Sequence, residues 1–233
     1  MSDRPFDIDL TKSQASERSF MSQVYLWMAL GLGITATVAM GLAANPSTVV
    51  GLSRGGLIFI LMLAQIGIVV WLSAAIGRIS VTTATIGFSI YATLNGVIFS
   101  TLFLVYTGAS IASTFITTAA TFAAVSVYGF VTKKDLTSIG SFLFMALIGL
   151  IIASVVNMFI KSSGFDLILS YVGVFIFIGL TAYDTQQLKH IHEQGVGAGE
   201  ALQKVSLMGA LRLYLDFINL FLLLLRIMGR RRD

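Results

Sequence analysis

The chain has 233 residues, of which 56% are hydrophobic and only 11% are charged. A soluble domain carries about 25% charged residues, so this composition indicates an integral membrane protein. The chain has no cysteine, which excludes disulfides, thiolate catalysis and cysteine-ligated metal sites. The net charge of +4 is modest. We interpret it as a topology and lipid-headgroup signal, and not as a surface for nucleic acid.

The first 19 residues are polar and of mixed charge, and we expect them to form a flexible tail. The first apolar run follows at residues 20–44. It is longer than the roughly 7–15 residues of a signal-peptide core, so we interpret it as the first transmembrane helix and not as a cleaved leader.

Six further apolar runs follow, and each reaches the roughly 20 residues that a helix needs to cross about 30 Å of hydrocarbon. They span residues 56–76, 82–106, 109–131, 139–160, 165–188 and 205–227. The runs are continuous rather than alternating, which argues against a transmembrane β-barrel. The sequence therefore predicts an all-α integral membrane protein with seven transmembrane helices.

The connections between the runs are short, except for residues 45–55 and 189–204. The second of these is hydrophilic and contains glycines, so we expect an exposed, flexible loop. The domain organisation that follows is a cytoplasmic tail (1–19), a single transmembrane domain (20–229) and a short basic C-terminal tail (230–233).

The distribution of basic residues favours a cytoplasmic N-terminus, because the loops on that side then hold most of the lysines and arginines. The loops on the opposite side hold Arg54 and Lys161. The basic stretch Arg230–Arg232 does not fit, since seven crossings place it outside. Either the last helix crosses fully with its basic tail outside, which we favour, or it is broken near Asp216 and re-enters.

Two aspartates lie inside the last two runs. Asp216 lies about 11 residues into the run 205–227, or about 16 Å along a helix. A carboxylate at that depth costs several kcal/mol unless it faces protein or water. Asp184 lies a few residues before the end of the run 165–188. The two carboxylates can meet if these helices pack antiparallel with some offset, which the sequence alone leaves open.

If the two aspartates meet, they cannot both ionise cheaply, and the pair retains one proton. A shared proton would hold the two helices together, and its loss would push them apart, which makes a pH-operated gate. The same carboxylates attract calcium. Because calcium takes roughly 6–8 oxygen ligands, Asp184 and Asp216 alone would form only a weak, transit-like site.

Simpler interpretations compete with this gate. Asp184 can be solvated at the membrane interface, and Asp216 can be neutralised by Arg212, which precedes it by one helical turn. Arg78 follows the second run, on the same predicted side as Asp184. It can latch Asp184, or it can be an ordinary anchor of the positive-inside pattern.

Nothing in the sequence indicates an enzyme. It contains no nucleophile elbow, no P-loop and no His-Glu-x-x-His motif. His190 and His192 are two positions apart, so they do not share a helix face, and a metal site there is not expected. We therefore expect a protein that is not an enzyme and carries no cofactor.

Three segments of the chain resemble the transmembrane Bax-inhibitor-motif family, in its bacterial branch. They read AYDTQQLK at the end of the sixth run, LYLDFINLFLLLLRIMG in the last run, and RIS-VTTAT…YATLNGV…FLVYT over residues 78–107. The resemblance covers nearly the whole chain. It implies a bacterial inner-membrane protein in which six helices surround a central last helix.

The resemblance also implies a hydrogen-bonded, pH-sensing aspartate pair that controls a calcium leak. The matching positions are Asp184 and Asp216, and the family's latching arginine matches Arg78. Some bacterial relatives instead modulate a membrane-bound AAA protease. A modulator that binds such a protease through its N-terminal tail is therefore the alternative function. A proton-coupled transporter is a third option, which the lack of an inverted repeat disfavours.

Overall fold

The structure, a computed structural model, describes residues 4–54, 56–194 and 199–232, with side chains from residue 16 onward. Within these residues it contains helices and no strand. The helices are α1 (Arg4–Ala43), α2 (Pro46–Ser53), α3 (Leu57–Ala75), α4 (Val81–Ser100), α5 (Leu102–Val105), α6 (Gly108–Val131), α7 (Thr137–Ile160), α8 (Ser163–Glu193) and α9 (Glu200–Met228). Seven helical segments are long and apolar enough to cross a membrane, so the predicted all-α, seven-helix fold is confirmed.

Local sequence signals set several of the helix starts. Ser80, Thr107 and Ser162 are the N-caps of α4, α6 and α8, and each hydroxyl accepts a hydrogen bond from the backbone N–H three residues later. Such caps satisfy one of the N–H groups that the first helical turn leaves unpaired. The three helices therefore begin close to the start of the predicted apolar runs.

The N-terminal segment differs from the flexible tail that the sequence predicts, because α1 is helical from Arg4 onward. No glycine or proline occurs between Phe6 and Leu30, so the chain has no signal that would separate the tail from the first span. The connection 45–55 also contains a helix, α2, with Pro46 at its first position, where the fixed φ of proline suits a helix.

The connection 189–204 is also shorter than predicted, because both neighbouring helices extend into it. α8 continues to Glu193, where Lys189 and Glu193 form an i,i+4 ion pair of 3.9 Å. α9 begins at Glu200. Of the flexible loop that the sequence predicts, residues 195–198 lie outside the described residues.

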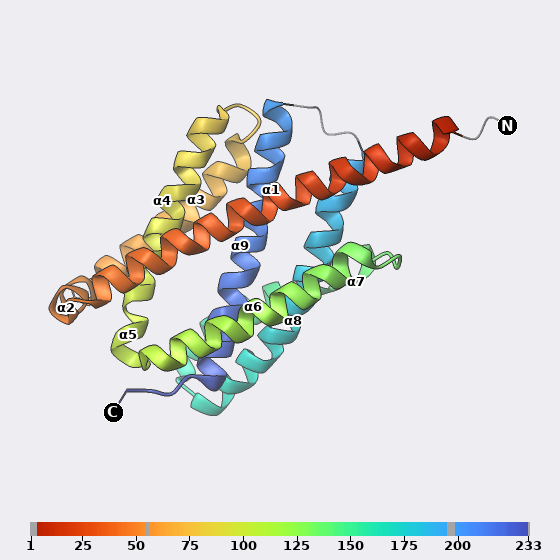
Figure 1. Ribbon diagram of the computed structural model, residues 1–233. Helices are drawn as coiled ribbons and strands as arrows, with labels where there is room; N and C mark the ends of the chain where they lie inside the picture. The colour runs from red at the N-terminus through yellow and green to blue at the C-terminus, as the bar shows by residue number, and fades with distance from the viewer. Residues whose placement is uncertain (1–3, 55, 195–198, 233) are drawn as a thin grey trace.

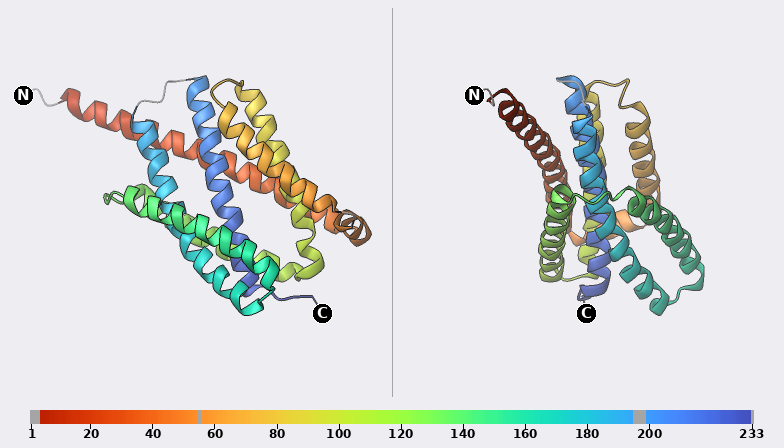
Figure 2. Two further views of the ribbon diagram at one scale, coloured as in Figure 1. Left: turned by 180° about the vertical axis from the view of Figure 1, so that it is seen from behind. Right: turned by 90° about the vertical axis from the view of Figure 1, so that its right-hand side faces the viewer.

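The last helix, α9, packs against α1, α4, α6 and α8. α9 has the largest buried share of the seven spans, with 61% of its apolar window buried, against 6% for α3 and for α7. α3 packs on α4, and α7 packs on α8. Figure 2 shows α9 in the gap between these two outer helices. This side of α9 borders a cleft, and its Arg212 and Arg226 side chains are exposed.

α9 is a single helix without a break at Asp216. The alternative of a last helix that is broken there and re-enters is therefore wrong. Because α9 crosses the whole bundle, the C-terminus lies at the opposite end from the N-terminal part of α1 (Figure 1).

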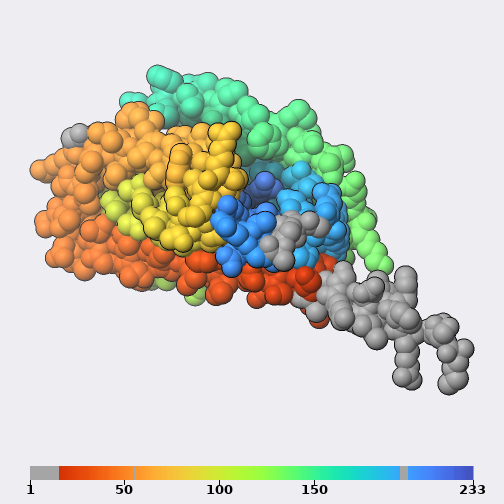
Figure 3. All heavy atoms as spheres, turned by 90° about the horizontal axis from the view of Figure 1, so that it is seen from above, coloured from red at the N-terminus to blue at the C-terminus, as the bar shows by residue number. Residues whose placement is uncertain are grey.

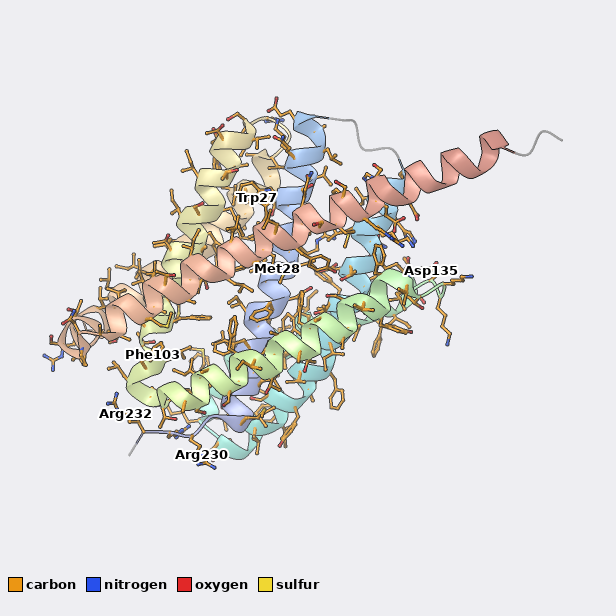
Figure 4. All side chains as sticks on the ribbon, in the orientation of Figure 1. Trp27, Met28, Phe103, Asp135, Arg230 and Arg232 are labelled. Atoms are coloured by element: carbon orange, nitrogen blue, oxygen red, sulfur yellow. The ribbon has the colours of Figure 1, made fainter. Side chains whose placement is uncertain are left out.

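The basic residues after α9 are held against the connection between α5 and α6. The backbone N–H of Thr107 donates to the carbonyl of Arg230 (3.1 Å), and the N–H of Arg232 donates to the carbonyl of Val105 (2.8 Å). Figure 4 shows Arg230 and Arg232 beside this connection. Backbone hydrogen bonds thus hold the C-terminal tail across one end of the bundle.

A buried hydroxyl pair joins α1 to α9. Thr35 Oγ1 and Tyr214 Oη lie 2.6 Å apart, and both side chains are buried. The Thr35 hydroxyl also lies 2.9 Å from the carbonyl of Ala92 on α4. Three helices therefore meet at one hydroxyl group, which fixes how α1 and α4 sit against α9.

We expect Thr35→Val to lower the free energy of unfolding by about 1–3 kcal/mol, because it leaves the buried Tyr214 hydroxyl without this partner. Thr37→Val is the matched control, because Thr37 is an exposed residue of the same helix. Thermal unfolding of both variants in the same detergent measures the difference. Equal shifts for the two variants would show that the hydroxyl pair contributes nothing.

Candidate functional site

α8 and α9 bring Asp184 and Asp216 together inside the bundle. The two carboxyl groups lie within hydrogen-bonding range of each other. Asp184 is 9% exposed and Asp216 is 5% exposed. Asp216 Oδ2 is buried and has no N–H or O–H partner among the described residues. A proton held between the two carboxyl groups is the donor that this arrangement lacks.

Arg212 forms its ion pair with Asp184. The i,i+4 spacing on α9 would also have allowed a pair with Asp216. The Nη1 atom of Arg212 lies 3.5 Å from Asp184 Oδ1, across the gap from α9 to α8. The Arg212 side chain is 50% exposed. An exposed guanidinium at this depth is costly in hydrocarbon, so its position indicates a cleft that admits water.

Arg78 does not contact Asp184. It is exposed in the turn between α3 and α4, and no ion pair within the described part of the chain includes it. The reason is the position of its helix, because α3 packs on α4 and not on α8. The latch that the sequence assigned to Arg78 is thus absent from this structure, and Arg212 is the cation beside Asp184.

A cleft of about 970 Å³ runs along one face of α9, from Arg212 to Arg226, with α7 and α8 as its walls. The α9 residues that line it recur every three or four positions, as one face of a helix requires. They include Arg212, Leu215, Asp216, Asn219, Leu222 and Arg226. Figure 3 shows a hollow between α4 and α7, with atoms of α9 at its bottom. The aspartate pair therefore borders an open cleft that also holds Asp166, Arg212 and Arg226, and not a sealed core.

A second charge pair lies at the other end of the cleft. Arg226 Nη1 and Asp166 Oδ1 are 2.9 Å apart. Asp166 is in the first turn of α8 and Arg226 is in the last turn of α9, where each charge suits the helix dipole. This pair was not predicted from the sequence. The sequence feature that could have predicted it is a pair of opposite charges, one at the start of the sixth apolar run and one at the end of the seventh. These ends meet when the two helices pack antiparallel.

The charges that line the cleft nearly cancel. Three aspartates (Asp166, Asp184 and Asp216) face two arginines (Arg212 and Arg226). With all five ionised, the cleft carries a net charge of −1, and one proton on the aspartate pair brings it to zero. The net charge that lines the cleft therefore depends on the protonation of this pair.

The end of α8 beyond the cleft is tied to α1. Lys189 Nζ lies 3.5 Å from Glu17 Oε1, and His192 Nε2 lies 3.1 Å from Ser16 Oγ. The His192 ring stacks on Phe20 with 4.9 Å between centroids. In the described part of the chain, no cluster of three or more acidic or histidine side chains could hold a metal ion. The histidine serves to pack α1 against α8.

Comparison with known proteins places the chain among bacterial membrane proteins. The profile of the family described as "Inhibitor of apoptosis-promoting Bax1" matches residues 17–233. The chain is 48% identical to the inner membrane protein YbhL of Escherichia coli K12 over 231 residues, which is 98% of each chain. It is 45% identical to a protein of Rickettsia prowazekii over 216 residues, which is 93% of this chain and 91% of the relative. A membrane protein of Streptococcus pyogenes is 35% identical over 94% of this chain and 96% of its own length.

Proposed function

Since the chain belongs to the Bax inhibitor-1-like family and is a multi-pass inner-membrane protein, we propose that it is a pH-sensitive calcium leak channel gated by Asp184 and Asp216. The observation that supports this most is the position of the pair. Two carboxyl groups face each other within the bundle and border a cleft that also holds a half-exposed arginine.

At low pH one proton lies between the two carboxyl groups. The pair is then an O–H donor and a carboxylate acceptor, which is a strong, short hydrogen bond. It joins α8 to α9 at the depth of Arg212, and the charges that line the cleft sum to zero. A cation that enters the cleft gains no net attraction, and the helices are held together.

At higher pH the proton leaves. Two like charges about 4 Å apart repel by about 4 kcal/mol at an effective dielectric constant near 20, which is sufficient to change the balance between two packings of α8 and α9. The cleft then carries a net negative charge. Loss of the proton therefore both loosens the pair and makes the path attractive to cations.

Calcium fits this site as an ion that binds weakly and transiently during conduction. It prefers carboxylate, carbonyl and hydroxyl oxygens and takes roughly 6–8 of them. The cleft offers Asp184 and Asp216 together with Asn219, Asn157 and Ser154. Two carboxylates are too few for a tight site, so the ion is held briefly and released, as conduction requires.

Purified protein in liposomes that contain a calcium indicator tests the proposal. We expect calcium to enter faster than in empty liposomes, and the rate to rise as the pH increases from about 6 to about 8 as the pair loses its proton. A rate equal to that of empty liposomes at every pH would exclude the channel.

Removal of the arginine beside the pair should increase the leak. Arg212→Gln makes the cleft more negative by one charge, and we expect calcium entry at low salt to rise about tenfold, with a smaller effect at high salt. Arg78→Gln is the matched control and should leave entry unchanged, because Arg78 lies outside the cleft. If calcium entry rose with Arg78→Gln and not with Arg212→Gln, the result would support the Arg78 latch that was predicted from the sequence.

The alternative, a modulator of a membrane-bound AAA protease, is favoured by one feature. α1 continues as a helix to Arg4, beyond the candidate span Ser16–Ala43. Deletion of residues 2–15 removes this extension and keeps the Ser16 and Glu17 contacts with α8. A channel retains its calcium flux after this deletion. A modulator loses its effect on proteolysis and shows no flux before or after it.

A further inference from the structure

An apolar crevice separates α1 from α6, on the side of the bundle away from the aspartate pair. Figure 1 shows the two helices side by side, with α9 behind them. The larger part of the crevice has a volume of about 900 Å³ and is lined from Arg18 to Ala36 on α1. A smaller part of about 330 Å³ continues toward Met40 and Phe103. Phe217 of α9 is part of the lining of the larger part.

The α1 wall of this crevice is polar at one end and apolar beyond it. Arg18, Ser22 and Tyr25 line its first part, at the i, i+4 and i+7 positions of one helix face. The α1 residues that line it further in carry no polar group: Met28, Ala29, Leu32, Gly33 and Ala36. Small residues at three of these five positions leave the space that forms the crevice.

The α6 wall adds one polar group to this lining. Ser126 lies toward the Arg18 end, and its buried hydroxyl has no hydrogen-bond partner among the described residues. Its neighbours at the same end, Val127 and Phe130, are apolar. Ala119, Phe122 and Ala123 follow deeper in the crevice. The polar groups of the crevice, most of them on α1, therefore lie toward the Arg18 end, and the surface beyond them is apolar.

We propose that the crevice binds one anionic phospholipid from the leaflet on the Arg18 side. Its phosphate lies at Arg18, its glycerol and ester groups lie at the level of Ser22, Tyr25 and Ser126, and one acyl chain lies along α1 past Gly33. Arg18 is exposed at the mouth, where a cation near the membrane surface attracts anionic headgroups.

The length and the charge of the crevice fit a lipid. The α1 wall from Arg18 to Met40 is about 33 Å long at 1.5 Å per residue, close to the thickness of the hydrocarbon core. An acyl chain can follow the apolar part of this wall, and the exposed guanidinium of Arg18 at its polar end matches an anionic headgroup.

A photoactivatable phosphatidylglycerol, with the reactive group in its acyl chain, tests the proposal on the full chain in liposomes. We expect labelled peptides from α1 and α6 residues of the crevice. Gly33→Leu should reduce this labelling severalfold, because a Cβ at Gly33 meets nothing within 4 Å and the added side chain fills the crevice. Gly41→Leu is the matched control on α1, where a Cβ also meets nothing, and it should leave labelling unchanged.

A second variant pair tests the opposite wall. Ala123→Leu narrows the crevice from α6 and should also reduce labelling, whereas Ala124→Leu, at the neighbouring exposed position that does not line it, should not. Arg18→Gln should reduce the preference for the phosphatidylglycerol probe over a phosphatidylcholine probe about fivefold, and Arg78→Gln should keep it. Gel filtration of each variant serves as the control for folding.

Two results would overturn the proposal. One is labelling that is equal in Gly33→Leu and Gly41→Leu, or that spreads evenly over the lipid-facing sides of α3 and α7. The other is cross-linking of α1 or α6 to a second protein chain, which would make the crevice a protein interface. Neither result depends on calcium flux, so the lipid site and the channel are tested separately.

Discussion

Asp216→Asn should abolish the pH dependence of calcium entry while the protein remains folded. An asparagine amide donates a hydrogen bond to Asp184 at every pH, so it replaces the protonated carboxyl group permanently. The cleft then keeps the net charge that it has with one proton bound. We expect calcium entry to stay at the low-pH level of the wild type from about pH 6 to about pH 8.

The matched control for this variant is Asp166→Asn, which makes the same change at the other end of the same cleft. It removes a partner of Arg226 but leaves the aspartate pair intact, so entry should still rise with pH. Fluorescence measurements in indicator-loaded liposomes compare the two. A flat profile in both variants, or a wild-type profile in Asp216→Asn, would contradict the gate.

Asp184→Asn should differ from Asp216→Asn in one respect. It also flattens the pH profile, but it removes the carboxylate that faces Arg212. Both variants leave the cleft with the same net charge, but in Asp184→Asn the Arg212 guanidinium is left without its ion-pair partner. We therefore expect this unpaired cation to repel calcium, so that calcium entry at low salt is lower in Asp184→Asn than in Asp216→Asn, with similar entry at high salt.

Gly129→Leu should prevent the bundle from forming its native packing. Gly129 lies at a close approach of α6 to α8, and an added Cβ would collide with the backbone of Ala182. Backbone cannot move aside as the end of a side chain can. Overpacking in a core costs about 1–3 kcal/mol and occasionally more, and we expect the upper end of that range or above.

Gly108→Leu is the matched control on the same helix, because a Cβ at Gly108 meets nothing within 4 Å. Yield after gel filtration and the midpoint of thermal unfolding measure both variants. We expect a marked loss for Gly129→Leu and near wild-type behaviour for Gly108→Leu. Equal behaviour would mean that α6 and α8 do not approach each other as closely at Ala182.

Much of the fold follows from the sequence, because a membrane span has to be long and apolar throughout. The seven predicted runs correspond to the seven observed spans, and hydroxyl caps such as Ser80 and Ser162 fix several starts. The parts that differ are helices that are not apolar spans. The extension of α1 to Arg4 is polar, and α2, with 8 residues, is too short to cross a membrane, so a search for long apolar runs does not predict them.

The candidate site was predictable only in part. A carboxylate at the depth of Asp216 costs free energy in a membrane, so the sequence indicated that Asp216 has a partner. Asp184 was a candidate because it lies in the preceding apolar run. Which cation faces the pair depends on how the helices pack. The position of α3 on α4 leaves Arg78 exposed, while the rotation of α9 directs Arg212 toward α8. Spacing along one chain does not contain that information.

The most direct test of the account is an infrared measurement of the carboxyl groups in the lipid-reconstituted protein during a pH titration. We predict a protonated-carboxyl band that disappears over the same pH range in which calcium entry rises, and that is missing from Asp216→Asn. If the band is absent from the wild type at every pH from about 6 to about 8, or if entry rises while the band persists, the two aspartates do not share the proton that gates the leak.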